Sequence, residues 1–447
     1  MLSVLKTSSF RHLFMAQVVA LLGTGLLTVA LGLLAYELAG DSAGLVLGTA
    51  YTIKMVAYVG LAPIAAVVTS RMNRKSVLIC ADLCRAGVAL CLPFIDAVWQ
   101  IYILIFVLQA ASATFTPTFQ AVIPDILKDE KDYTSALSLS RLAYDIENLV
   151  SPALAGLLLT VISFHWLFFG TVFGFVVSAL LVLVTVIPPL LKKAEEGTFW
   201  NRVTRGSKIY LATPRLRGLL SLNLAIAATG SMVLVNTIVF VRSSFEGSEQ
   251  DVAIVFACYG AGSMIAAFAL PSVLERMRDW PVMMVGGLGS TVVTLTFALI
   301  FLTKGLPSWP VFLATWAVLG LLGSLVMTPS GRLLRRSAHS EDRPALFAAQ
   351  FALSHACWLI AYPTAGYFGK WFGLGATMVV LAGLALLGCW AVYWFWPSKP
   401  QQVLEHSHDD LPPDHPHLAD AVVKNGRSVH RHYFVIDDEH RVWPTQG

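Results

Sequence analysis

Long stretches without Asp, Glu, Lys or Arg recur along the 447-residue chain. They cover residues 13–36, 97–124, 148–191, 218–241, 252–274, 280–303, 305–331, 344–369 and 371–398. About 20 helical residues cross the hydrocarbon core of a bilayer, so each stretch can span a membrane and 148–191 can form a helical hairpin. Together with 44–70 and 76–95, which hold few charges, the pattern predicts twelve transmembrane helices.

The longest internal polar stretch divides these spans into two groups of six. Residues 191–217 are rich in Lys and Arg and follow the sixth predicted span. We therefore predict an all-α membrane protein with an N-terminal six-helix bundle (1–190), a cytoplasmic linker (191–217), a C-terminal six-helix bundle (218–397) and a His-rich cytoplasmic tail (398–447).

Proline positions recur in the same order in both halves. Pro117 in span 4 matches Pro329 in span 10, and Pro152 in span 5 matches Pro363 in span 11. This recurrence indicates a duplicated six-helix unit. Two similar bundles can rock about a central site, and prolines suit this motion because they bend helices and free backbone carbonyls.

The distribution of basic residues predicts the orientation. Charged residues make up 13% of the chain, where a soluble domain has about 25%. Of the 31 Lys and Arg residues, only Arg242, Lys304 and Lys370 fall in loops on one side, and three more lie within spans. Because cytoplasmic loops are enriched in Lys and Arg, both termini are expected in the cytoplasm of a bacterial inner (plasma) membrane. The basic surface reflects this topology and not nucleic-acid binding.

A basic turn between predicted spans 2 and 3 resembles a known family motif. Residues 66–75 carry Arg71, Arg74 and Lys75 where the major facilitator superfamily has the pattern Gly-x-Leu-Ala-Asp-Arg-x-Gly-Arg-Lys; Ser70 stands in place of the Asp. With twelve spans in two halves, the chain resembles this superfamily. The resemblance implies secondary active transport without a cofactor, and a gating role for the three basic residues.

Span 5 adds a resemblance to exporters. Ser151, Pro152 and Gly156 resemble the Gly-Pro-x-x-Gly-Gly antiporter motif of the superfamily, in which Ser151 replaces the first glycine. The opening residues 9–14 and the region of spans 4 and 5 resemble the exporter branch that holds siderophore exporters and NreB-like nickel-resistance permeases. This resemblance implies efflux.

Ionisable residues within predicted spans are the candidates for coupling. A charge in the bilayer centre costs about 2.5–3.5 kcal/mol, so Lys54, Arg141, Asp145 and Glu147 call for an explanation. Arg141 and Asp145 are four residues apart and can pair on one helix face, which leaves Glu147 without that partner. One hypothesis is that Glu147 and Asp145 bind a proton or cation, with Lys54 and Arg141 as switching counter-charges. The alternative is a static salt-bridge network that fixes helix packing.

Two further polar features lie within spans. Asp82 and Arg85 are three residues apart in span 3, a spacing that indicates a structural pair. His355 in span 11 is either a hydrogen-bonded packing residue or a metal ligand or proton relay.

The tail holds seven of the eleven histidines. Six form three His-x-His pairs: His406, His408, His415, His417, His430 and His432. Residues i and i+2 of an extended chain lie on the same side, so each pair could offer two nitrogens to one metal ion. The alternative is a solvated polar tail in which histidine is incidental. We also predict that residues 433–443 form a small hairpin that packs against the cytoplasmic face of the bundle.

The sequence favours a transporter over other membrane proteins. A phosphate-binding loop of a primary pump and a nucleophile–base set of an enzyme are both missing from it. We predict a monomeric, proton-coupled exporter of a divalent metal cation, nickel or cobalt first. The alternative is an exporter of an organic substrate such as a drug, siderophore or metal chelate. The expected partners are the lipid bilayer, protons and the small solute or metal ion.

Overall fold

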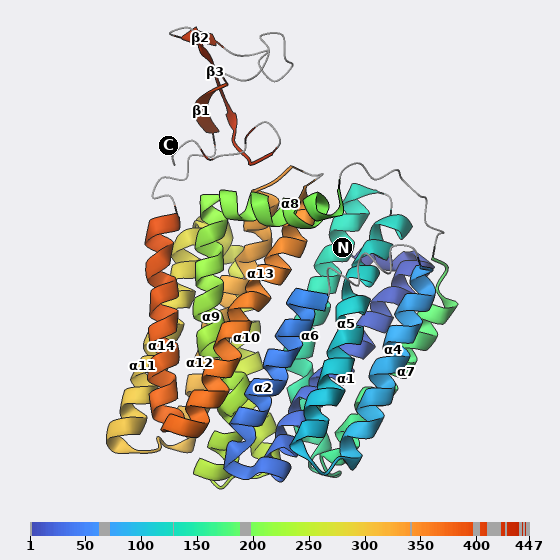
Figure 1. Cartoon of the computed structure of the whole chain (residues 1–447), viewed down its shortest axis with the longest axis vertical. Coiled ribbons are helices and arrows are strands. Elements are labelled where there is room, and N and C mark those ends of the chain that lie inside the picture. The colour runs from blue at the N-terminus through green and yellow to red at the C-terminus, as the bar shows by residue number, and fades with distance from the viewer. Residues whose placement is uncertain are drawn as a thin grey trace.

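The computed structural model of the chain describes residues 2–61, 72–127, 129–187, 198–339, 342–396, 403–408, 422–424, 427–437, 440 and 443. Six long helices form the N-terminal half: α1 (Ser8–Ala39), α2 (Ala43–Val56), α4 (Arg74–Cys91), α5 (Val98–Ile126), α6 (Glu130–Leu158) and α7 (His165–Val184). Six more form the C-terminal half: α9 (Pro214–Val239), α10 (Glu249–Arg276), α11 (Asp279–Lys304), α12 (Trp309–Arg335), α13 (Arg343–Pro363) and α14 (Gly369–Phe395). The predicted two-bundle helical architecture is confirmed (Figure 1).

Most of these helices are long and apolar enough to cross a membrane. Nine stretches of the described residues qualify, and two of them, Ser8–Leu61 and Ala345–Phe395, contain two helices each. The twelfth long helix, α6, carries Glu147 and two further charged residues in its middle and is not among the nine. The apolar stretch 148–191 is divided between α6 and α7, as expected of a hairpin.

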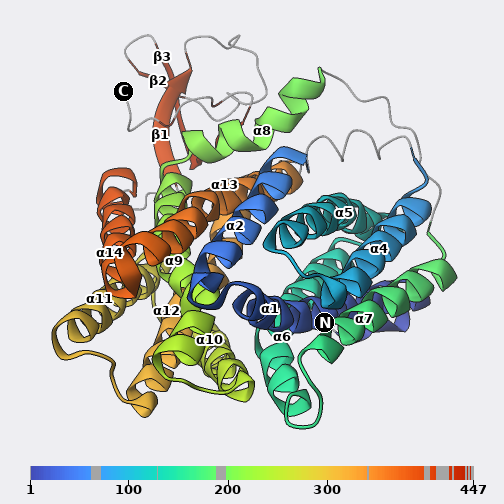
Figure 2. The ribbon, with the colours of Figure 1, turned by 60° about the horizontal axis from the view of Figure 1, so that its bottom comes forward.

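Neighbouring helices repeat in the two halves, as a duplicated unit requires. In the first half α1 contacts α6 and α7, and α4 contacts α5 and α7. In the second half the corresponding helix α9 contacts α13 and α14, and α11 contacts α12 and α14. The halves meet through two equivalent pairs, α2 with α13 and α6 with α10 (Figure 2).

Small residues set the closest helix contacts within each half. A Cβ on Gly262 of α10 would lie 1.7 Å from the carbonyl oxygen of Ala317 on α12, and one on Gly320 would lie 1.9 Å from that of Tyr259. Side chains are thus excluded at these crossings, and the helix backbones approach each other directly. Such packing is typical of membrane helices, which gain little from hydrophobic burial against apolar lipid.

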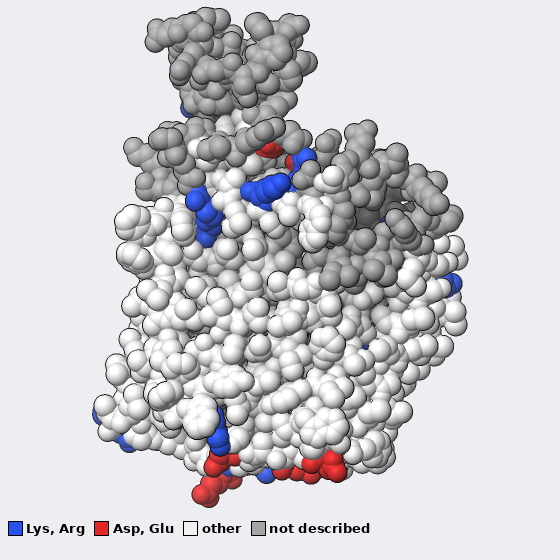
Figure 3. Space-filling view, viewed as in Figure 1, with Lys and Arg blue, Asp and Glu red and all other residues white. Residues whose placement is uncertain are grey.

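On the face seen in Figure 3, charged side chains gather toward the two ends, and the surface between them is largely uncharged. Large apolar side chains are exposed on this belt; Phe173 and Phe268, for example, are 67% and 76% exposed. An apolar belt between polar ends is the arrangement that a lipid bilayer requires.

One short helix lies across an end of the bundle (Figure 1). This helix, α8 (Phe199–Ala212), belongs to the segment between the halves, and we call the end that it covers the α8 face. Arg205 forms a bidentate ion pair with Asp342 at the start of α13, with Nε 2.5 Å from Oδ1. Tyr210 donates a hydrogen bond to Gln350 Oε1 at 2.5 Å, and burial raises the pKa of its phenol well above the ordinary value. These contacts fasten α8 to the C-terminal half.

The tail forms a small sheet beyond the α8 face (Figure 1). Strands β1 (Val403–His408), β2 (Val422–Lys424) and β3 (Arg427–Tyr433) are antiparallel in the order β1-β3-β2. The predicted hairpin over 433–443 is wrong in position, because β3 ends at Tyr433 and the described residues after it form no strand. The expected packing of that segment does occur.

Residues that follow β3 pack against the bundle. Phe434, Val435, Ile436 and Trp443 are each at most 5% exposed. The Arg215 guanidinium of α9 lies 5.8 Å from the Trp443 ring. The segment is further held through Asp437, whose Oδ2 lies 3.3 Å from His339 Nε2 in the connection between α12 and α13. The tail sheet is therefore anchored to the C-terminal half.

Candidate functional site

A polar and aromatic cluster lies where the two halves meet, near the middle of the helices. Lys54 of α2, Tyr58 in the π-helical continuation of α2 (η3, Ala57–Leu61) and Glu147 of α6 come from the first half. Phe351 and His355 of α13 come from the second half. We call these five residues the central cluster.

Electrostatic and ring contacts connect the members of the central cluster. The Lys54 ammonium lies 5.6 Å from the Tyr58 ring centroid and within electrostatic range of both Glu147 and His355. The Tyr58 ring lies 5.2 Å from the His355 ring, edge to face, and 5.6 Å from the Phe351 ring. Contacts of α2 with α13 thus join the N-terminal half to the C-terminal half at this cluster.

A local hydrogen bond constrains the His355 ring. Nδ1 lies 2.6 Å from the Phe351 carbonyl oxygen one helical turn earlier. A neutral imidazole that donates from Nδ1 keeps Nε2 as an acceptor. His355 could then take up a proton on Nε2, or accept a hydrogen bond there from a bound solute.

Sequence reasoning identified Lys54, Glu147 and His355 separately, and the fold brings them together. It missed Tyr58 and Phe351, because aromatic residues are ordinary in membrane helices and their spacing gives no signal. Arg141 and Asp145 lie on α6, but their side chains are outside the described part, so their pairing stays a prediction.

The segment that resembles an antiporter motif packs at two interfaces. A Cβ on Gly25 of α1 would lie 2.1 Å from Ser151 Cβ and 3.3 Å from the Glu147 carbonyl oxygen, so α6 touches α1 directly beside Glu147. A Cβ on Gly156 would lie 3.1 Å from Ala253 Cβ of α10, in the other half. The side chain of Pro152 is outside the described residues. The segment thus contacts α1 of its own half and α10 of the other half.

The predicted gating motif is described only in part. Arg71 lies outside the described residues, while Arg74 and Lys75 begin α4. Asn73, which replaces the second glycine of the family pattern, caps this helix: its Oδ1 accepts from the backbone N–H of Lys75 at 2.9 Å and of Ser76 at 3.4 Å. The gating role of the three basic residues stays a prediction.

The second half has an ion-pair network at the corresponding position, which the sequence did not reveal. Asp279 begins α11, and Arg332 of α12 donates to its Oδ1 from Nε at 2.9 Å. Arg336 Nη1 lies 3.5 Å from Asp279 Oδ2, and Arg332 also donates to the Leu274 carbonyl oxygen at 3.2 Å. This network ties the ends of α10, α11 and α12 together at the α8 face.

The pair predicted within span 3 is formed inside the first half. Arg85 pairs with Asp82, whose other carboxylate oxygen accepts a hydrogen bond from Ser178 at 2.8 Å. The Arg85 guanidinium lies between the rings of Phe115 and Phe175, at 4.1 and 4.5 Å. Its position away from the interface between the halves fits a role in holding α4, α5 and α7 together.

The two halves also meet at the end opposite the α8 face. A Cβ on Gly48 of α2 would lie 2.8 Å from the Cα of Gly366, in the π-helical turn after α13 (η6, Thr364–Phe368). Gln250 of α10 donates to the Leu159 carbonyl oxygen after α6, at 2.5 Å. A cavity of about 190 Å³ lies beside these contacts, lined by residues that include Asp41, Asn236 and Lys370.

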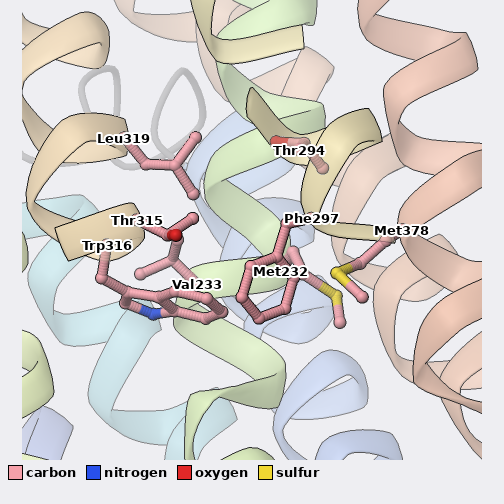
Figure 4. A pocket seen from close by; sticks show the side chains of 8 residues that line it. All are labelled: Met232, Val233, Thr294, Phe297, Thr315, Trp316, Leu319 and Met378. Carbon is pink, nitrogen blue, oxygen red and sulfur yellow. The ribbon is translucent and has the colours of Figure 1, made fainter. Parts of the chain in front are cut away.

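A second cavity lies inside the C-terminal half (Figure 4). It is lined by Met232, Val233, Thr294, Phe297, Thr315, Trp316, Leu319 and Met378. Its volume of about 10 Å³ approaches the space that one water molecule needs. It is too small for any molecule larger than water.

Metal ligation finds no support among the described side chains. Within that part of the chain, no group of three or more His, Cys, Asp or Glu residues is placed to hold a metal ion. Among the described residues, His355 therefore belongs to no group of side chains that could hold a metal ion. The side chains of His406, His408, His430 and His432 are outside the described part, and His415 and His417 are outside it entirely.

The fold and the repeated helix contacts agree with a known family. The sequence profile of the Major Facilitator Superfamily matches residues 13–221 and 219–435. The chain belongs to this superfamily. It is accordingly a multi-pass membrane transporter, and its setting is consistent with a bacterial plasma membrane.

Several relatives within the superfamily are similar in sequence. An uncharacterized transporter of Bacillus subtilis, YvqJ, is 23% identical over 402 residues, which cover 85% of this chain and 92% of the relative. Macrolide efflux protein A of Streptococcus pyogenes is 28% identical over 186 residues, 40% of this chain and 45% of the relative. The matched region thus spans less than half of that macrolide efflux protein.

Solved structures show the same fold. The nucleoside transporter NupG superposes with a TM-score of 0.68 and 13% identity, covering 87% of this chain and 100% of that chain. An inward-facing bacterial homologue of the lysosomal transporter Spinster has a TM-score of 0.66 and 14% identity, covering 88% of this chain and 98% of that chain. The predicted membership of the superfamily is confirmed, whereas the finer branch of siderophore and nickel exporters stays a prediction.

Proposed function

We propose that this transporter exports an organic solute from the cytoplasm in exchange for protons. The observation that carries the proposal is the position of Glu147, a carboxylate in the central cluster within electrostatic range of the Lys54 ammonium and at the contact of α6 with α1. In this proposal the α8 face is cytoplasmic, as the Lys and Arg distribution predicts.

The exchange would rest on a competition for the Glu147 carboxylate. When it is ionised, the carboxylate attracts the Lys54 ammonium or a cationic group of the solute, because a charge in an apolar medium is stabilised by its opposite. A proton bound to the carboxyl removes that attraction and releases the solute. Proton and solute would then occupy the site in alternation, which is the requirement for antiport at one site.

Aromatic residues favour an organic solute over a bare ion. Beyond the central cluster, the Tyr51 ring of α2 lies 5.0 Å from that of Tyr362 on α13, which in turn lies 5.0 Å from Trp358. Aromatic faces suit apolar and cationic organic groups. The relatives named as macrolide efflux proteins support the same substrate class.

A divalent metal cation is the second candidate substrate. Its support is the set of His-x-His pairs in the tail, which lies outside the bundle. The central cluster contains one histidine and one carboxylate, fewer donors than the four that divalent zinc usually takes. We therefore rank metal export below organic export.

The test uses Glu147→Gln in everted membrane vesicles energised by a proton gradient. We expect this variant to lose uphill uptake of amphipathic cationic dyes and macrolides, yet to retain solute exchange without a gradient. Glu37→Gln is a matched control, since the Glu37 side chain is 53% exposed beside His165 at the end opposite the α8 face. Uphill transport by Glu147→Gln at the rate of the unaltered protein would rule out the coupling role.

The same vesicles rank the two substrate classes. Nickel and cobalt uptake is measured in parallel with the organic panel. Proton-driven metal transport without transport of any organic solute would reverse the ranking.

A further inference from the structure

The cavity at the end opposite the α8 face lies between the two halves. Its volume is about 190 Å³, and Asp41 and Leu45 line it from the N-terminal half. The lining from the C-terminal half includes Asn236 of α9, with Gly369 and Lys370 at the start of α14. Because an enclosed cavity of about 150 Å³ can hold benzene, this cavity has room for an aromatic ring that carries a small polar group.

Asn236 presents a buried acceptor to this cavity. The residue is 1% exposed, and its Nδ2 donates a hydrogen bond to the Ala365 carbonyl oxygen at 3.1 Å. This bond identifies the other amide atom as the oxygen, Oδ1, because a carbonyl accepts only from the nitrogen. Among the described residues, no group donates a hydrogen bond to Oδ1. A buried amide oxygen without a partner costs free energy, so Oδ1 calls for a donor inside the cavity.

Two glycines keep the space around this oxygen open. A Cβ on Gly369 would lie 3.1 Å from Asn236 Oδ1, and a Cβ on Gly44 of α2 would lie 2.4 Å from it. A side chain at either position would therefore occupy the space that a donor needs. Both glycines have negative φ angles, so the backbone conformation does not demand glycine there. Their close approach to the Asn236 amide is the structural reason for the missing side chains.

Two exposed residues of opposite charge line the same cavity. Asp41 belongs to the short 3-10 helix η2 (Gly40–Ser42) of the N-terminal half, and Lys370 belongs to α14. The Lys370 ammonium donates to Ser42 Oγ across the interface between the halves. Within the described part of the chain, the Asp41 carboxylate forms no ion pair. The cavity thus combines a free carboxylate with the buried Asn236 oxygen, while its one ammonium is already hydrogen-bonded.

We propose that this cavity binds the ammonium group of a small organic amine. An N–H of the ligand donates to Asn236 Oδ1, its positive charge faces Asp41, and its apolar body packs against Leu45 and Leu374. A carboxylate or phosphate would instead place its oxygens against two acceptors. The site is separate from the central cluster and does not depend on which solute is exported. Because its ligand contacts both halves, binding stabilises the arrangement in which they meet at this end.

The test measures whether benzylammonium protects the cavity from a thiol reagent. The full-length protein is purified in detergent with Leu45→Cys in a background without the six native cysteines, and its reaction with a water-soluble maleimide is followed. Benzylammonium should slow the reaction in a saturable manner. Benzyltrimethylammonium carries the same charge without an N–H donor, and benzoate carries the opposite charge. Each should need a concentration at least about 10-fold higher for equal protection, the ratio expected when a hydrogen bond to a charged group is lost.

Variants of the cavity identify the groups that bind the ammonium. Gly369→Ala covers Oδ1 but keeps Asn236 and its bond to Ala365, so it tests the site even if Asn236→Ala does not fold. Each of these two variants should weaken protection by about 10- to 100-fold. Asp41→Asn should have a smaller effect, because that carboxylate is exposed to solvent. Gly383→Ala is the matched control on α14, since a Cβ there would meet nothing within 4 Å, and it should leave protection unchanged.

The variant Glu147→Gln separates this site from the central cluster. Protection by benzylammonium should persist in it, whatever its effect on uphill transport, and loss of protection there would assign the ligand to the central cluster instead. The proposal is also overturned if benzylammonium gives no protection at millimolar concentrations, or if benzoate or benzyltrimethylammonium protects equally well. Unchanged protection in Gly369→Ala would show that Asn236 Oδ1 does not contact the ligand.

Discussion

The glycine contact between α2 and η6 allows a quantitative test of how the halves separate. Gly48 faces Gly366 so closely that an added Cβ would lie 2.8 Å from its Cα and 2.9 Å from the Tyr362 carbonyl oxygen. Carbon atoms attract best at about 3.5–4.0 Å, so Gly48→Ala would force the interface apart by about 0.7 Å or more. The substitution should therefore disfavour the arrangement in which the halves meet at this end.

The size of the effect follows from the cost of overpacking. Inserting a methyl group into a tight contact costs about 1–3 kcal/mol, which corresponds to about a 5- to 150-fold shift between two conformations. Gly60, in η3 on the same helical segment, is a matched control, because a Cβ there would meet nothing within 4 Å. Gly60→Ala should leave the equilibrium unchanged.

The assay follows the accessibility of the cavity beside the contact. A single cysteine at Leu45, which lines that cavity, is placed in a background without the six native cysteines. Its rate of reaction with a water-soluble maleimide should rise in Gly48→Ala, and uphill export should fall because the transport cycle needs both conformations. Equal labelling rates in Gly48→Ala, Gly60→Ala and the parent protein would refute the reasoning.

Three further predictions concern the α8 face. Asp279→Asn removes the negative charge that Arg332 and Arg336 share and replaces one acceptor oxygen by a donor NH2 group, so it should lower the free energy of unfolding by about 1–3 kcal/mol, measured by thermal unfolding in detergent; an unchanged midpoint would mean that the network contributes nothing. Trp443→Ala should release the buried segment after β3, so limited proteolysis should cleave the tail faster while the bundle unfolds at its original temperature; equal cleavage rates would contradict the anchoring. A reporter that is active only in the cytoplasm should be active when it is fused after Gly447, because the C-terminus is expected on the cytoplasmic side. Activity of a reporter that works only in the periplasm would reverse the proposed orientation.

Much of the fold could be predicted from the sequence because a bilayer imposes a strong constraint. Backbone groups in lipid must satisfy their hydrogen bonds internally, so a long uncharged stretch has to become a helix. The hairpin over 148–191, the two groups of six helices and the packing of the tail end all follow from apolar runs. The duplication was indicated by the matching prolines Pro117, Pro152, Pro329 and Pro363. In the structure, α1 and α9 have corresponding neighbouring helices, as a duplication requires.

The limits of prediction are clearest where contacts join distant segments. Asp279 and Arg332 are 53 positions apart, and spacing along the chain says nothing about their pairing. The sheet was missed for the same reason. Strands as short as β1 and β2 have weak local signals, and the register that opposes His406 to His430 is set by pairing across the intervening residues.

By itself, the sequence determined the apolar spans, their division into two halves, and the identity of the costly ionisable residues within the spans. It identified Lys54, Glu147 and His355 one at a time, because the price of placing a charge in lipid can be read from a single position. Only the tertiary structure decided that these three share one site with Tyr58 and Phe351. The reason is that the crossing of α2 with α13 depends on glycine contacts such as that of Gly48 with Gly366, and such contacts have no local signature.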